Sequence, residues 1–308
     1  MSADRPEKRD VHGWIALDKA AGKTSTESVA AVRRLFRAKK AGHAGTLDPL
    51  ATGMLPIALG EATKTVPFVM DGRKAYRFTV RWGVETDTDD AEGRVLSTSE
   101  VRPSAEAIRA ALPRFTGEIA QVPPRYSALK IEGERAYDLA REGEAVALAA
   151  RPVAVHRLEL VATPDADHAA FEAECGKGTY VRALARDLGR ALGSLGHVES
   201  LRRMRVGPFA EGDAVTLAEL AGLFETGGEA ALMSALRPVE TGVQALPAVN
   251  VSRGDAQRLV LGQSVLLRGR DAPLVAGLVS VSTGGALVAL AEMEQGALKP
   301  KRIFNLPR

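Results

Sequence analysis

One segment of the chain, residues 39–56, most constrains the fold because glycines recur through it every few positions. It reads KKAGHAGTLDPLATGMLP. Glycine at this density predicts a loop built from tight turns. The loop carries one carboxylate, Asp48, and cations flank it in the sequence. A lone carboxylate in a basic loop suits chemistry on a nucleic acid.

The length and composition predict an ordinary globular protein of two domains. The chain has 308 residues, of which 45% are hydrophobic and 26% charged, and a domain usually takes roughly 100 to 200 residues. No apolar run approaches the roughly 18 residues that cross a bilayer. Residues 1–10 are polar and lack the apolar core of a secretory signal, so we expect a flexible tail and a cytoplasmic location. The single cysteine, Cys175, excludes an internal disulfide.

The net charge of +3 and the pI near 9.0 are too mild to establish a nucleic-acid partner. Three local clusters of cations say more, since binding to a phosphate backbone needs such clusters. Any one of them, taken alone, is as often a solvated face. The clusters are Arg33, Arg34, Arg37, Lys39 and Lys40; Arg202, Arg203 and Arg205; and Lys299, Lys301 and Arg302.

Hydrophobic periodicity predicts several elements in the first 240 residues. A helix over 27–38 has Thr24, Ser25 or Thr26 as its cap, with Gly42 to Gly45 ending it. Residues 121–143, with two prolines and many charges, predict an exposed insertion containing a short helix. The other expected elements are strands over 14–19, 76–82 and 153–160, and helices over 104–115 and 179–192.

The character of the chain changes after Pro238. Short β-type runs, separated by glycine, aspartate and serine, predict a small β-barrel-like module of about 60 residues. Its boundary is expected near residues 241–247. The runs cover residues 246–251, 264–267, 274–281 and 286–291.

Several familiar sites are incomplete in this sequence. A phosphate-binding P-loop ending at Gly22 needs a glycine at the position of Leu17, and a calcium loop opening at Asp87 needs glycine where Glu92 stands. The five histidines lack zinc-site spacing, and no Gly-x-Ser-x-Gly elbow occurs. We therefore expect neither a metal nor a nucleotide triphosphate. Asp48 before Pro49 would by itself suit a helix N-cap, and His43 would suit a turn.

Four segments in combination favour a different interpretation. They are GHAGTLDPLATG at 42–53, GVETDTDD at 83–90, QVPPRYSALK at 121–130 and GTYVRAL at 178–184. Together they resemble the bacterial TruB family of tRNA pseudouridine synthases. The resemblance covers nearly the whole chain, and the segment around Asp48 is its most specific part.

The resemblance implies an α+β fold. A mixed, largely antiparallel central sheet flanked by helices would form the catalytic domain over 11–240, with an RNA-gripping insertion at about 124–152. A small PUA-like β-barrel would occupy 247–308 and bind RNA, after a flexible tail at 1–10. The implied activity is isomerisation of uridine 55 in the T loop of tRNA. It needs no cofactor, no metal and no obligate protein partner, and the chain would be a monomer.

The resemblance also implies roles for single residues. Asp48 matches the indispensable aspartate, Arg182 the arginine that pairs with it, and Tyr76 the tyrosine that stacks on the everted uracil and helps to remove its C5 proton. Asp90 would steady Arg182 from the other side. Positions that would contact the substrate are His43, Tyr180, Leu201, Lys19, Lys64 and Lys130.

Two other functions stay open at this point. The chain could be a non-catalytic tRNA-binding protein or a tRNA-folding chaperone on the same fold. It could also resemble the guide-RNA-dependent synthases of archaea and eukaryotes, which share the catalytic core and work with partner proteins. Formation of pseudouridine in naked tRNA by the lone chain would exclude a guide-dependent synthase. A refolding assay with Asp48→Asn could still show chaperone work alongside catalysis.

Overall fold

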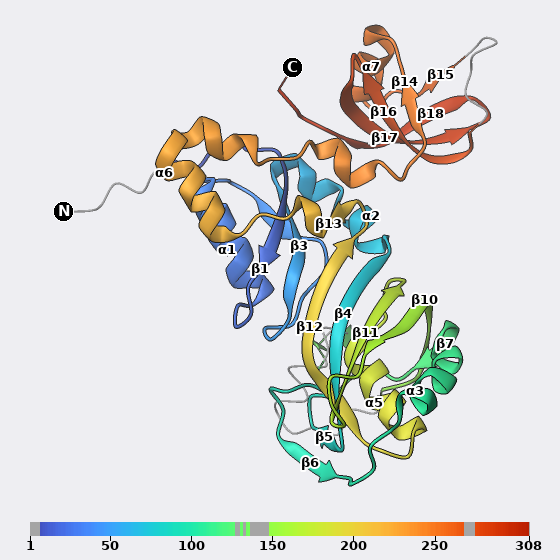
Figure 1. The fold of residues 1–308 in the computed structure, drawn as a ribbon. Coiled ribbons are helices and arrows are strands. Elements are labelled where there is room, and N and C mark those ends of the chain that lie inside the picture. The colour runs from blue at the N-terminus through green and yellow to red at the C-terminus, as the bar shows by residue number, and fades with distance from the viewer. Residues whose placement is uncertain (1–6, 127–129, 132–133, 136–147, 268–274, 308) are drawn as a thin grey trace.

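The computed structural model describes residues 7–126, 130–131, 134–135, 148–267 and 275–307. One long sheet organises its larger part (Figure 1), with the strand order β1-β3-β12-β4-β11-β10-β7. Strand β2 pairs with β3 and β13 with β12. Among the described strands of this sheet, only β3 and β12 pair in parallel. The expected mixed, largely antiparallel sheet is therefore confirmed.

Its strands are β1 (Gly13–Lys19), β2 (Ala41–His43), β3 (Thr52–Leu59), β4 (Lys74–Trp82), β7 (Gly117–Gln121), β10 (Arg151–Ala162), β11 (His168–Cys175), β12 (Gly196–Val206) and β13 (Phe209–Ala210). Two separate hairpins are formed by β5 (Val84–Thr86) with β6 (Val95–Thr98) and by β8 (Lys130–Ile131) with β9 (Glu134–Arg135).

Helices flank the sheet, as expected. In Figure 1, α1 and α6 lie beside β1, whereas α3 and α5 lie at the opposite end of the long strands β4 and β12. The α-helices of this part are α1 (Ser25–Leu35), α2 (Val66–Asp71), α3 (Ala105–Ala111), α5 (Val181–Ala191) and α6 (Leu217–Ser234). The 3-10 helices are η1 (Gly60–Lys64), η2 (Leu112–Phe115), η3 (Glu211–Asp213) and η4 (Val239–Val243).

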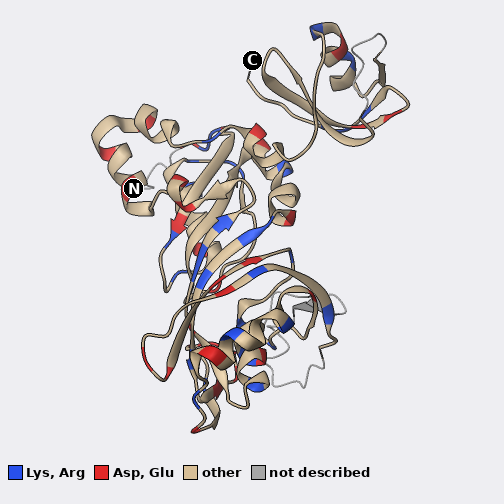
Figure 2. Ribbon diagram, turned by 45° about the vertical axis from the view of Figure 1, so that its right-hand side comes forward, with Lys and Arg blue, Asp and Glu red and all other residues tan. Residues whose placement is uncertain are grey.

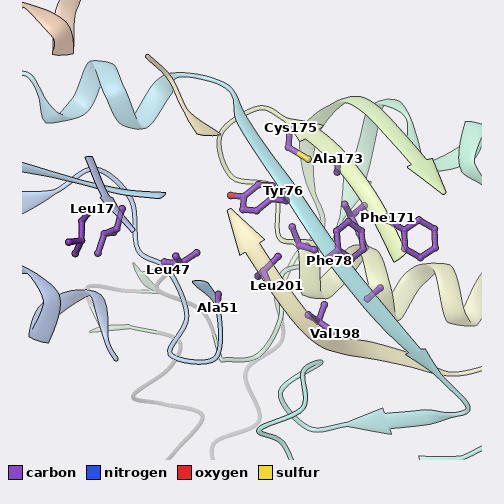
Figure 3. Close-up of a cluster of buried hydrophobic side chains, with 14 of the residues drawn as sticks. Leu17, Leu47, Ala51, Tyr76, Phe78, Phe171, Ala173, Cys175, Val198 and Leu201 are labelled. Carbon is purple, nitrogen blue, oxygen red and sulfur yellow. The ribbon is translucent and has the colours of Figure 1, made fainter. Parts of the chain in front are cut away.

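The core lies where β4 and β11 meet the apolar stripe of α5. Phe78 stacks on Phe171 with ring centroids 5.3 Å apart, and Trp82 meets Phe171 edge-on at 6.3 Å. Leu184 and Leu188 of α5 are fully buried against the same cluster. Figure 3 shows the two phenylalanines on one side of β4, with the hydroxyl of Tyr76 directed away from them. The middle of β4 is therefore packed core, and its first residues border the site.

Most elements expected from periodicity are present, with shifted ends. The strand over 14–19 and the capping role of Thr24 are confirmed, since the Thr24 side chain accepts from the Glu27 amide. The predicted end of the first helix is wrong. The helix stops at Leu35, not at Ala38, and Gly42 to Gly45 do not end it. Arg37 takes a positive φ of 52°, which an α-helix cannot continue through.

The expected insertion lies largely outside the described residues. β7 ends at Gln121, and residues 122–126 follow it without regular structure. The short helix expected within 121–143 falls on positions that the structure does not describe, apart from the backbones of β8 and β9.

The C-terminal part forms its own five-stranded sheet in the order β14-β16-β17-β18-β15. The four expected runs are strands, whereas α7 and β18 were missed. No pairing joins β14 to β15 among the described residues, so closure into a barrel stays a prediction. The elements are β14 (Ala248–Asn250), α7 (Arg253–Val260), β15 (Val265–Leu266), β16 (Gly277–Thr283), β17 (Ala286–Glu294) and β18 (Ala297–Ile303).

The C-terminal sheet contacts the larger part through η1 and η4. Lys64 of η1 donates to the Ile303 carbonyl at 2.9 Å, and its ammonium lies 5.7 Å from the centre of the Phe304 ring. Glu61 accepts from the Asn305 amide at 2.8 Å. Across the parts of the chain described here, no helix combines the length and apolar character needed to span a bilayer.

Candidate active site

The Asp48 loop joins β2 to β3 and is held by hydrogen bonds from its neighbours. Ser25 at the start of α1 accepts from the Leu47 amide at 2.9 Å and donates to the Leu47 carbonyl at 3.0 Å. Gly53 closes the loop against β12: its φ is 99°, and a Cβ there would stand 2.3 Å from the Arg203 carbonyl oxygen. Residues 49–51 form no helix. Asp48 is therefore not a helix cap.

Arg182 holds the Asp48 carboxylate with two hydrogen-bonding contacts. Its Nε lies 2.9 Å from Asp48 Oδ2, and its Nη2 lies 3.3 Å from Oδ1. The same guanidinium donates to the backbone carbonyls of Thr88 and Tyr126, both at 2.9 Å. Arg182 is 6% exposed, and the Asp48 side chain is 32% exposed. Two contacts in one plane fix the orientation of a carboxylate, here with its open side toward solvent.

Asp90 contacts Arg182 from the other side, as expected. Its Oδ2 lies 3.4 Å from Nη1, and Thr88 Oγ1 donates to its other oxygen at 2.5 Å. Burial raises the pKa of Asp90, and the Thr88 hydrogen bond and Arg182 oppose the rise. One turn along α5, Arg186 pairs with Asp89 at 3.0 Å. The adjacent Asp89 and Asp90 thus bind arginines four residues apart on α5, which fixes the helix against this turn.

Tyr76 lies on β4 and pairs across the sheet with Arg203 of β12. Arg203 is 3% exposed, and it donates to the carbonyls of Met54 at 2.8 Å and of Gly45 and Thr46 at 3.0 Å. The guanidinium also meets the Tyr76 hydroxyl. Burial raises the pKa of Tyr76, and the positive charge of Arg203 opposes that rise.

These elements enclose a cavity of about 320 Å³, a size typical of small-ligand sites. The Asp48 loop forms one wall, and the start of β4 and two residues of β12 form the wall across from it. The turn 176–180 and the start of α5 complete it. The lining residues are Gly45, Thr46, Leu47, Asp48, Met70, Asp71, Lys74, Tyr76, Gly176, Lys177, Gly178, Thr179, Tyr180, Val181, Arg182, Leu201 and Arg203.

Residues 33–181 match the family model described as "TruB family pseudouridylate synthase (N terminal domain)", and residues 182–244 match "tRNA pseudouridylate synthase B C-terminal domain". A curated relative from Bradyrhizobium diazoefficiens, named tRNA pseudouridine synthase B, is 65% identical over 98% of this chain and 88% of its own length. The chain belongs to the TruB family. A relative of the same name from Brucella ovis is 55% identical over 96% of this chain and 97% of its own.

Solved structures agree with this TruB-family assignment at the level of the fold. A chain of an H/ACA RNP bound to a substrate RNA containing 2′-deoxyuridine superposes with a TM-score of 0.75. It is 27% identical and covers 96% of this chain and 86% of its own. A chain of a Cbf5-Nop10-Gar1 complex gives a TM-score of 0.73 at 28% identity, with coverages of 94% and 84%.

The cavity brings together five of the residues expected from the TruB resemblance. Asp48, Arg182, Tyr76, Tyr180 and Leu201 all line it. In Figure 3, Leu201 of β12 lies beside Tyr76. The backbone of Tyr180 is clamped by Gln121, which accepts from the Tyr180 amide at 2.8 Å and donates to its carbonyl at 3.1 Å.

His43 does not line the cavity. It is half-buried at the end of β2, and its Nδ1 has no hydrogen-bond partner among the described residues. Burial lowers the pKa of His43, and the nearby charge of Arg203 lowers it further. His43 is therefore a neutral imidazole at the point where β2 passes into the Asp48 loop.

Of the lysines expected near the active cleft or the RNA path, Lys19 and Lys64 do not line the cavity. Lys19 is 1% exposed and donates to the carbonyls of Lys23 and Pro49 at 2.7 and 3.2 Å, so it secures the loop from behind. Lys64 is engaged with the C-terminal part through Ile303 and Phe304. Lys130 is in β8, and its side chain lies outside the described residues.

Two cavity residues, Lys74 and Arg203, were missed as site residues. Arg203 was expected in an exposed cluster, yet it is buried, and its neighbours Arg202 and Arg205 pair with Asp18 and Glu174. Figure 2 shows basic and acidic positions interleaved over the central strands. This cluster is therefore no open phosphate-binding surface. The sequence did contain a signal for Lys74: it stands two residues before Tyr76 on the same strand, so both side chains point to the same face.

The described residues contain no group of three or more histidine, cysteine or carboxylate side chains placed to hold a metal ion. Cys175 is fully buried behind the cavity wall, and burial raises the pKa of its thiol to about 12. At neutral pH this thiol is therefore protonated and unreactive.

Proposed function

We propose that this chain converts uridine 55 in the T loop of tRNA to pseudouridine. One observation carries the proposal: in a TruB-family chain, Asp48 stands in a cavity with its carboxylate oriented by Arg182 and with Tyr76 on the facing strand. The reaction breaks the N1–C1′ bond and forms a C5–C1′ bond, while the C5 proton leaves and N1 gains a proton. It is an isomerisation, so no co-reactant is required.

Asp48 supplies the reactive carboxylate in this proposal. Arg182 holds it in one rotamer, with one edge open to the cavity. An ionised carboxylate can attack C1′, take the 2′ proton or add to the base. Each route needs the same position beside the ribose. Asp90 and Thr88 are positioning residues here, because they act through Arg182.

The uracil enters the cavity after extrusion from the T loop, since chemistry on a base requires its removal from the stack. Tyr76 and Tyr180 supply aromatic surface that replaces the lost stacking, and Leu201 closes the apolar side. Tyr76 would also help to remove the C5 proton. The Arg203 charge beside its hydroxyl only partly offsets the burial that raises the pKa of Tyr76. His43 would contact the T loop outside the cavity.

The remaining assignments follow from the same proposal. Residues 11–240 form the catalytic domain, the insertion at about 124–152 grips the T-stem loop, and residues 247–308 form a PUA-like RNA-binding domain after the tail at 1–10. Lys130, in that insertion, would contact the RNA backbone. The chain works in the cytoplasm as a monomer, with tRNA as its partner.

Asp48→Asn tests the proposal. It keeps the size of the side chain and removes the charge, so pseudouridine formation in a T-stem-loop transcript should fall at least a thousandfold. The dissociation constant for tRNA should stay within about threefold, because phosphate contacts supply most of the affinity. Asp213→Asn, which weakens the half-buried pair with Arg237, is the control and should retain full activity. A normal rate in Asp48→Asn would refute the assignment.

Wild-type chain incubated alone with naked tRNA tests the two alternatives. Pseudouridine at position 55 would exclude a guide-RNA requirement. A tRNA refolding assay with Asp48→Asn would reveal chaperone work that does not depend on catalysis.

A further inference from the structure

Two buried cations in the cavity wall have no carboxylate partner. Lys74 is 8% exposed, and its ammonium donates to the Met70 carbonyl. Arg203 is 3% exposed and bonds to backbone carbonyls and the Tyr76 hydroxyl. Neither forms a salt bridge with any residue that the structure describes. Burying an unpaired charge is unfavourable, so both cations need a reason to be there.

The carboxylates of the cavity are already used. Asp48 is paired with Arg182, and Asp71 is paired with Lys177 at 3.0 Å. The lining contains four cations, Lys74, Lys177, Arg182 and Arg203, against these two carboxylates. The cavity therefore keeps an excess of positive charge, and that excess lies on the wall formed by β4 and β12.

The two cations lie on either side of Tyr76. Lys74 and Tyr76 are two residues apart on β4, so their side chains share one face of the sheet. Arg203 stands opposite Tyr76 on β12. Burial, together with the Arg203 and Lys177 charges, lowers the pKa of Lys74 to about 8, and the Asp71 carboxylate opposes this shift. A bound anion would relieve this mutual repulsion.

We propose that Lys74 and Arg203 form an anion-binding site that holds an anionic oxygen of the everted nucleotide beside Tyr76. The inference deepens the proposed function and rests on it. Two oxygens of the substrate have the required charge. One belongs to a phosphate next to the everted nucleotide and is charged throughout. The other is a uracil oxygen, which gains negative charge when the base leaves C1′ with the bonding electrons.

Lys74→Met and Lys74→Arg test the site in the full chain. Lys74→Met keeps the length of the stem and removes the charge, whereas Lys74→Arg keeps the charge. Arg77→Met is the matched control: Arg77 is on the same strand, its side chain is 57% exposed, and it pairs with Glu172 on the other face. For each variant, the dissociation constant for a T-stem-loop RNA and the single-turnover rate are measured, with melting curves to verify folding.

Loss of the Lys74 charge should change either the dissociation constant for RNA or the single-turnover rate at least tenfold. If the oxygen belongs to a phosphate, Lys74→Met weakens RNA binding and replacement of the flanking phosphates by neutral methylphosphonates has no added effect in that variant. If it belongs to the uracil, Lys74→Met lowers the single-turnover rate at an unchanged dissociation constant. In both cases Lys74→Arg stays within about threefold of wild type and keeps its rate above pH 8, where the wild-type rate declines. Arg77→Met behaves as wild type.

The inference is overturned if folded Lys74→Met matches wild type in both measurements, or if Lys74→Arg is as impaired as Lys74→Met. Wild-type pseudouridine formation is scored separately. Activity with an indifferent Lys74 would leave the proposed function standing and remove the anion site. If the wild-type chain forms no pseudouridine but Lys74→Met binds RNA more weakly, the anion site stands and the proposed function is refuted.

Discussion

At the scale of single residues, the cations of the cavity differ in how many hydrogen-bond and ion-pair partners they have. Arg182 is saturated: Asp48, Asp90 and two carbonyls use its donors. Among the residues that the structure describes, Lys74 hydrogen-bonds only to the Met70 carbonyl. A saturated arginine orients a carboxylate, whereas an under-partnered lysine raises the energy of the folded state until a ligand arrives. Site residues of this kind commonly reduce stability.

Lys74→Met should therefore stabilise the folded chain. The lysine pKa falls from 10.5 to about 8 on burial, so the folded state binds this proton more weakly than the unfolded state does. The charged form then reduces the free energy of unfolding by roughly 1–3 kcal/mol at pH 7. The penalty is complete below pH 8 and fades as the pH rises toward 10.5, where the unfolded lysine also loses its proton.

Chemical denaturation of wild type and Lys74→Met at pH 7 and pH 10 measures this difference. The gap in free energy of unfolding should shrink at pH 10. Arg77→Met serves again as control, and an exposed pair such as Arg77–Glu172 should contribute less than about 1 kcal/mol. A Lys74→Met chain that is less stable than wild type at pH 7 would contradict the reasoning.

At the scale of elements, helix α1 positions the loop that carries Asp48. Its capping box, formed by Thr24 and Glu27, fixes where the first turn begins. That places Ser25, 4% exposed, against both backbone polar groups of Leu47. The start of α1, which is set by local sequence, thereby fixes Leu47, the residue that precedes Asp48.

Ser25→Ala should reduce both stability and rate. It leaves the buried N–H and C=O of Leu47 without partners, which costs roughly 1–3 kcal/mol, and it frees the loop beside Asp48. The single-turnover rate should fall about tenfold or more while tRNA binding is retained. Ser104→Ala also removes a serine hydroxyl at the start of a helix, here the N-cap of α3, and it should lower the melting temperature with no change in rate. Equal rates for the two variants would show that Ser25 has no positioning role.

At the scale of the whole molecule, the C-terminal sheet is attached by an apolar contact supported by polar bonds. Phe304, 5% exposed, packs with residues of both parts, including Leu290 and Val239. Lys64 and Glu61 of η1 bind the segment just around it. The sheet is thus held near the β1 end of the body (Figure 1), away from α5.

Phe304→Ala should release this contact. Truncating a buried phenylalanine costs about 3–5 kcal/mol, and this loss falls on the cluster that joins the two parts. We expect two thermal transitions in place of one, and faster proteolysis near residues 244–247. Leu261→Ala, in a residue 69% exposed on the same part, should leave melting and proteolysis unchanged. A single unshifted transition in Phe304→Ala would show that other contacts hold the sheet.

Sequence reasoning succeeded where the signal is local. The alternation of β4, the apolar stripe of α5 and the cap of α1 depend on residues within one or two turns, and the structure has all three. It failed on β12, whose arginine-rich end suggested an exposed basic surface. That strand is central because β3 and β4 pair with it, and no residue inside β12 encodes those partners.

The sequence by itself determined the family, the Asp48 segment and the periodicity of the elements, since each is written in consecutive residues. Only the tertiary structure decided which cations are partnered. Arg182 and Arg203 are both buried arginines, yet one faces a carboxylate and the other faces carbonyls. The distinction arises from segments more than 130 positions apart meeting at one cavity, and burial and Coulomb interactions depend on that distance in space and not on distance along the chain.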